Sequence, residues 1–187
     1  MNLVCLTPVQ IGYIASVYFL GYAFGGLAFT LPDKIGRKKS SLYGYVLALA
    51  GITAMIVIPN YYVRMASFFI LGVATIKDIA SPIWAAELVG VREMDKATAY
   101  TVVNVFDAAP VLVVYLSILL GGVDWYYLFS GILTMGYIAL IVCLFLGPES
   151  PEWLLMKGRR EEAIVALNRI AAFNGGEMID KDQQFVI

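Results

Sequence analysis

Three ionisable side chains lie within long apolar runs of this 187-residue sequence, and their positions suggest chemistry. Lys77 and Asp78 are in one run and Asp107 is in the next. A charged group in the hydrocarbon of a membrane is costly, so such residues generally face a water-filled cavity or pair with one another. The chemistry indicated is therefore ion pairing or recognition of a charged solute.

Composition excludes most catalytic chemistry. The chain has no histidine, which rules out imidazole metal sites, Ser-His-Asp and Cys-His catalysis and histidine proton relays. Cys5 and Cys143 show no metal-ligand or redox spacing. With 13 basic and 14 acidic residues, bulk charge gives no reason to expect a nucleic-acid partner. We expect no enzyme activity, no catalytic residue, no metal site and no cofactor.

The elements that must position these charges are membrane helices. The chain is 60% hydrophobic with a mean hydropathy of +0.79, whereas soluble domains are roughly 45–50% apolar. About 20 apolar residues suffice to cross a hydrocarbon core of about 30 Å. We expect an all-α, multi-pass membrane helix bundle over residues 1–147, followed by a cytosolic segment with short amphipathic helices over 148–187. The predicted spans are about 9–31, 41–58, 62–86, 97–120 and 125–146.

Helix geometry relates the charged residues by depth. A rise of ~1.5 Å per residue places Lys77 and Asp107 both roughly 13 to 15 Å from the same membrane face, on consecutive antiparallel spans. This arrangement permits a Lys77–Asp107 ion pair. Asn104 lies one turn before Asp107, and we expect it to form an interhelical hydrogen bond.

The distribution of basic residues predicts the orientation, because cytosolic connections are rich in lysine and arginine. With the N-terminus outside and the C-terminus cytosolic, only Arg64 lies near the outer face. The basic residues then at the cytosolic face are Lys34, Arg37, Lys38, Lys39, Arg92, Lys96, Lys157, Arg159, Arg160, Arg169 and Lys181.

Two motifs resemble those of a known family. Residues 33–38 (DKIGRK) resemble the cytosolic loop signature of the major facilitator superfamily, and residues 148–155 (PESPEWLL) resemble the motif that ends its first six-helix half. The second motif is similar to that of the organic cation and anion transporter branch. Glu87 and Arg92 also match that branch's spacing of a loop acid and a loop base. The resemblance implies that the five spans correspond to the second to sixth helices of an incomplete N-terminal half, so that the chain is a fragment of the carrier.

The resemblance implies transport of a small organic solute by alternating access, with the substrate near the midplane between two halves. The implied partners are the solute, the lipid bilayer and the missing C-terminal half. One alternative is a sugar-porter-like carrier. Another is a non-transporting, truncated membrane protein that assembles with a full-length partner.

The resemblance also implies roles for individual residues. Asp33 and Arg37 would form a latch that holds one access state closed; the alternative is that the basic residues of this loop only determine topology. The implied gating residues are Asp33, Lys34, Gly36, Arg37, Lys38, Glu87, Arg92 and Glu149. The implied substrate-pathway residues, as the alternative to a Lys77–Asp107 pair, are Lys77, Asp78, Asn104 and Asp107.

Helix packing and departures from the family pattern complete the expectations. Gly21 and Gly25 form a small-xxx-small pattern, interpreted either as a sliding contact between halves or as ordinary tight packing.

Phe29 stands where the family usually has glycine, and Pro32 directly precedes the loop aspartate. Glu152 stands where the family commonly has arginine, so an ion-pair network built on that arginine is not carried over.

Overall fold

The computed structural model describes residues 7–89, 93–119 and 124–180. Most of the described residues are helical, and none of them lies in a strand. The helices are α1 Pro8–Leu27, α2 Leu31–Ile35, α3 Arg37–Val57, α4 Tyr61–Val73, α5 Ile76–Val89, α6 Glu93–Leu119, α7 Trp125–Phe145, α8 Pro151–Met156 and α9 Arg160–Asn174.

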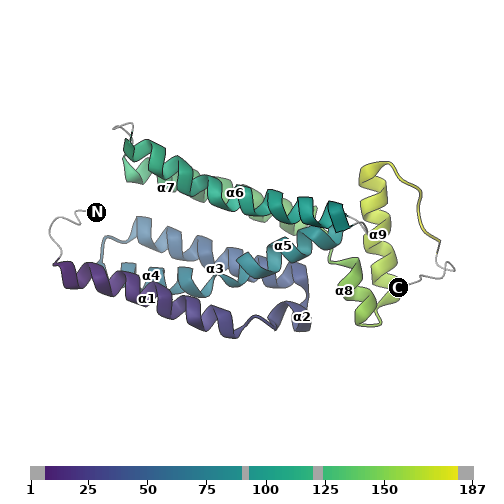
Figure 1. The fold of residues 1–187 in the computed structure, drawn as a ribbon, viewed down its shortest axis with the longest axis horizontal. Helices are drawn as coiled ribbons and strands as arrows, with labels where there is room; N and C mark the ends of the chain where they lie inside the picture. The colour runs from purple at the N-terminus through teal and green to yellow at the C-terminus, as the bar shows by residue number, and fades with distance from the viewer. Residues whose placement is uncertain (1–6, 90–92, 120–123, 181–187) are drawn as a thin grey trace.

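Helices α1, α3, α4, α5, α6 and α7 form the elongated body of the bundle, and the remaining helices gather at one end of it (Figure 1). Helix α1 packs on α4, α3 packs on both α4 and α5, α6 packs on α5, and α7 packs on α3. Helices α2, α8 and α9 lie at the same end, where α9 runs across the direction of the bundle (Figure 1). The expected all-α helix bundle is confirmed.

Three helical segments within the described residues are long and apolar enough to cross a membrane: Arg37–Val57, Tyr61–Val89 and Tyr126–Phe145. They correspond to the second, third and fifth predicted spans. Helices α1 and α6 occupy the positions of the first and fourth, and their crossing of a membrane stays a prediction.

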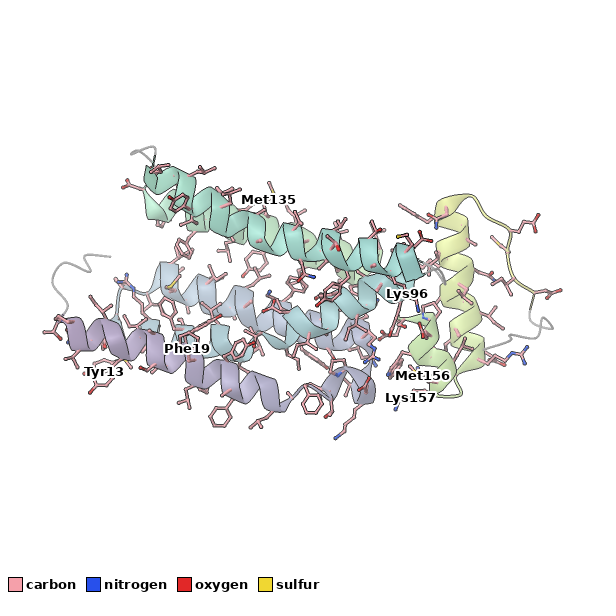
Figure 2. All side chains as sticks on the ribbon, in the orientation of Figure 1. Tyr13, Phe19, Lys96, Met135, Met156 and Lys157 are labelled. Atoms are coloured by element: carbon pink, nitrogen blue, oxygen red, sulfur yellow. The ribbon has the colours of Figure 1, made fainter. Side chains whose placement is uncertain are left out.

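Large apolar side chains point outward along the bundle, as expected for a surface that faces lipid rather than water. Phe19 on α1 is 66% exposed and Met135 on α7 is 72% exposed (Figure 2). The whole apolar window of the Tyr126–Phe145 segment lies outside the interior.

Two helix boundaries differ from the sequence expectation. The predicted span 41–58 begins earlier, at Arg37, because Gly36 makes the turn and the first basic residues join the helix. The predicted span 62–86 is divided into α4 and α5. At the division the Thr75 hydroxyl donates to the Gly72 carbonyl oxygen over 2.7 Å, satisfying a carbonyl at the end of α4.

Helices α1 and α4 approach each other backbone to backbone. A Cβ atom added to Gly21 would lie 2.2 Å from the Phe69 carbonyl oxygen, and one added to Gly72 would lie 2.2 Å from the Tyr18 carbonyl oxygen. A Cβ on Gly25 would lie 2.8 Å from the Val73 carbonyl oxygen. The glycine pair of α1 therefore packs tightly against α4, within the described bundle.

Candidate functional site

The loop motif forms a sharp turn between α2 and α3. Gly36 joins the two helices at φ 114°, a backbone conformation that side-chain-bearing residues rarely adopt. A Cβ at this position would lie 2.5 Å from Glu149 Oε2. Phe29 and Pro32 do not obstruct the turn: Phe29 is exposed, whereas Pro32 is buried at the start of α2. Lys34 is exposed beside it.

Arg37 lies at the centre of the motif and contacts two carboxylates. Its guanidinium pairs with Asp33, one turn earlier, and its Nε lies 3.3 Å from Glu87 Oε1 on α5. The Arg37 and Glu87 side chains are each 11% exposed, while Asp33 is 64% exposed. Burial of the two charges is costly, and their mutual pairing offsets that cost. The pair thus links the start of α3 to α5.

Glu87 has further capacity for interaction. Among the described residues, its Oε2 is buried without a hydrogen-bond partner. Arg92, the loop base predicted to act with Glu87, lies outside the described residues.

Glu149 caps the N-terminus of α3. Its Oε1 accepts hydrogen bonds from the backbone N–H of Lys38, at 2.8 Å, and from that of Ser150, at 3.1 Å. Gly36 occupies the N-cap position and has no side chain to satisfy the free N–H groups there. A carboxylate at this point also compensates for the basic first turn of α3 at the positive end of its dipole.

Two tryptophans fix the 148–155 motif to the bundle, and sequence reasoning did not predict the hydrogen bond of either. Trp153 Nε1 donates to the Asp33 carbonyl oxygen over 3.0 Å, and Trp84 Nε1 donates to the Pro148 carbonyl oxygen over 3.0 Å. Ser150 Oγ accepts from the Trp153 backbone N–H and so caps the N-terminus of α8. A buried indole N–H needs an acceptor, which is the signal that points to such anchors.

The departure at Glu152 creates its own ion pair. Lys96, near the start of α6, places its Nζ 3.3 Å from Glu152 Oε2 on α8 (Figure 2). The negatively charged Glu152, which stands where the family has arginine, is thus paired with a positively charged lysine of α6.

The candidate pathway residues lie apart from this cluster. Lys77 contacts Asp78, its chain neighbour, and its Nζ lies 5.7 Å from the centre of the Tyr45 ring on α3. The Asp107 side chain is not among the described residues, so a Lys77–Asp107 pair stays a prediction. Asn104 differs from the expectation: its amide donates to the Tyr100 carbonyl oxygen of its own helix over 2.7 Å, because it lies on an exposed face of α6.

Lys77 borders a cavity of about 790 Å³. The cavity is mostly apolar and lies between α3, α5, α6 and α7, with Tyr45, Lys77 and Tyr127 in its wall. Its size falls in the range of roughly 300–1,000 Å³ that small-molecule sites occupy. The structure thus separates a charged cluster at the end of the bundle from an apolar cavity along its length.

Comparison with known proteins gives consistent matches. The sugar (and other) transporter family matches residues 5–185. A putative metabolite transport protein of Bacillus subtilis, YfiG, is 30% identical over 88% of this chain and 36% of its own length. The beta-alanine transporter of Drosophila melanogaster is 30% identical over 93% of this chain and 28% of its own length. Human solute carrier family 22 member 16 is 28% identical over 92% of this chain and 30% of its own length. The chain thus spans about a third of the length of these curated relatives.

Proposed function

The chain belongs to the sugar (and other) transporter family of the major facilitator superfamily, and from this premise we propose that it forms part of a carrier that moves a small organic solute by alternating access. Its apolar helices make it an integral membrane protein. Its relatives include transporters named for organic cations and for beta-alanine. We propose a solute of this organic-ion type.

The observation that carries the proposal is the buried Arg37–Glu87 pair together with the Glu149 cap. These contacts join α3, α5 and residues 148–155 at one end of the bundle. Movement of any of these elements away from the others must break a buried pair or expose the free N–H groups of α3. A cluster of this kind favours one conformation and acts as a gate when the two access states differ in its contacts.

The orientation is part of the proposal. The end that carries α2, α8 and α9 is assigned to the cytosol because it is rich in basic residues, and the N-terminus is assigned to the outside. The lipid bilayer and the C-terminal half of a carrier are the proposed partners. If the chain instead acts without transporting, as a short membrane protein bound to a full-length carrier, its co-expression will change that carrier's uptake.

The class of solute can be identified by comparing the uptake of different solutes directly. Lys77 contacts Asp78, so its positive charge is balanced and gives no preference for an anionic solute. A sugar-porter-like carrier remains the second candidate, favoured by the family match itself. Uptake of a labelled organic cation, an organic anion, beta-alanine and a hexose, measured side by side in cells that express the full-length gene product, distinguishes these classes.

The gate is tested with Asp33→Asn in the same cells. We expect a clear loss of uptake with unchanged protein at the membrane, because the neutral side chain weakens the contact with Arg37. Asp124→Asn is the matched control, because Asp124 is exposed at the N-cap position of α7 and its side chain makes no capping hydrogen bond there. Unchanged uptake in Asp33→Asn would reject the gate, whereas no uptake of any solute by the wild-type protein would reject transport itself.

A further inference from the structure

A second cavity, of about 660 Å³, opens at the charged end of the bundle. It lies between the first turns of α3, the end of α7 and α9, and Lys38, Lys39 and Arg169 lie in its wall. We propose that this cavity binds the phosphate headgroup of an anionic phospholipid. The inference rests on insertion of the chain in a membrane and does not depend on which solute is moved.

Two of the basic side chains are held at the end of α7. Lys38 Nζ donates to the Leu144 carbonyl oxygen over 3.0 Å, and the Arg169 guanidinium donates to the Phe145 carbonyl oxygen. A lysine ammonium has three N–H donors and an arginine guanidinium five, so both groups keep donors for a ligand. Lys39 is exposed beside them. Three cationic groups from α3 and α9 thus converge on one cavity.

The acidic residues in the same wall are largely engaged elsewhere. Glu149 Oε1 accepts two backbone N–H groups. Both oxygens of Glu162 accept from Arg159, at 2.7 and 2.6 Å. With Glu162 paired to Arg159, which lies outside the wall, the carboxylates of Glu149 and Glu161 oppose three basic side chains. The cavity therefore carries a net excess of one positive charge, which complements a phosphate group.

The apolar part of the wall indicates a lipid rather than a free phosphate. Leu42, Leu144 and Val165 line the cavity beside the charged groups. Leu144 is 49% exposed, and Phe145, the last residue of α7, and Leu146, its C-cap, are also exposed. Because α7 ends here, these side chains lie at the level where headgroups meet acyl chains, and basic pockets between membrane helices on the cytosolic side suit anionic headgroups.

The test is a lipid titration of the purified full-length protein in detergent. Phosphatidylglycerol and phosphatidylcholine are added separately, and bound lipid is counted by native mass spectrometry. We expect saturable binding of phosphatidylglycerol that Lys39→Gln weakens about fivefold, the factor for ~1 kcal/mol per basic residue near the headgroups. Lys157→Gln is the matched control, because Lys157 is exposed at the same end but outside the cavity (Figure 2).

Three outcomes overturn the proposal. Equal effects of Lys39→Gln and Lys157→Gln indicate diffuse attraction to surface charge. Displacement of phosphatidylglycerol by equimolar glycerol phosphate indicates a site for free phosphate. Equal binding of phosphatidylcholine excludes recognition of negative charge. Arg169→Gln, checked for folding by its thermal unfolding temperature, provides a second variant, and weakened phosphatidylglycerol binding in that folded variant supports the site whereas unchanged binding counts against it.

Discussion

The α1–α4 interface and the charged end of the bundle hold helices together by opposite means. At the first, glycines on both helices bring backbones so close that an added Cβ would lie 2.2 Å from a carbonyl oxygen. At the second, residues that are distant in sequence meet through ion pairs and hydrogen bonds, as between the Arg37 and Glu87 side chains and between the Glu149 carboxylate and the Lys38 backbone N–H. The first contact is steric and uncharged, and the second is electrostatic and polar.

This difference separates fixed parts from switchable ones. A close backbone contact has no alternative partner and depends on shape alone. Charged groups can exchange partners or become hydrated when a conformation changes. The free-energy cost of that change depends on how deeply the charges are buried. We therefore expect the α1–α4 pair to move as one unit and the charged end to open and close.

The largest expected effect comes from breaking the steric contact. Gly72→Val should prevent accumulation of folded protein, with a destabilisation of at least ~3 kcal/mol, since the new side chain overlaps backbone atoms that cannot move aside. Fluorescence-detected size-exclusion chromatography in detergent measures the folded fraction. Gly26→Ala is the matched control, because nothing lies within 4 Å of its added Cβ. Equal folded fractions for wild type and Gly72→Val would refute the close packing.

A smaller but still large effect is expected at the charged end. Arg37→Ala leaves the Glu87 carboxylate buried without its partner, which should lower the free energy of unfolding by about 3 kcal/mol. Thermal unfolding in detergent, followed by tryptophan fluorescence, measures this loss.

The double variant Arg37→Leu, Glu87→Leu sharpens the comparison. Replacing both charges with apolar side chains should restore much of the stability while uptake stays low, because the switchable contact is gone. Recovery of uptake along with stability would show that the pair serves only the fold.

The smallest effect is expected for the half-exposed pair between α6 and α8. Breaking it by Lys96→Glu should cost only about 0.2–1 kcal/mol, and adding Glu152→Lys should recover that loss, since exposed ion pairs contribute little. A double-mutant cycle on unfolding temperature measures the coupling. An unrecovered loss in the double variant would mean that Lys96 stabilises through other contacts.

Local sequence signals predicted the parts of the fold that depend on neighbouring residues. A serine followed by proline is typical of a helix start, and the structure places Ser150 Oγ at the start of α8 as the acceptor for the Trp153 N–H. The apolar runs predicted long helices because helix formation and burial in lipid both follow from residue type over about 20 positions. The spacing of Gly21 and Gly25 predicted a close helix contact, because small residues four positions apart let another helix backbone approach.

Contacts between distant residues were not predictable in this way. The hydrogen bond by which Glu149 caps α3 joins it to Lys38, 111 residues earlier in the chain. The Trp153–Asp33 hydrogen bond spans 120 residues. Neither leaves a periodic pattern in the sequence. The division of the third span at Thr75 also depends on the fold, where α4 meets the glycines of α1. Lys77 illustrates the limit: counting residues predicted a membrane depth for it, which stays a prediction, but gave no sign of its contact with Tyr45.

The cap on α3 has a consequence for biogenesis. Glu149 is added to the growing chain 111 residues after Lys38, the residue whose N–H it accepts. At a synthesis rate of about 5–20 residues per second, α3 waits roughly 5 to 20 s for its cap. During that interval its first turn carries several positive charges and no carboxylate acceptor from the 148–155 motif. Closure of the charged end is therefore a late step in assembly, which follows insertion of the helices whose ends it joins.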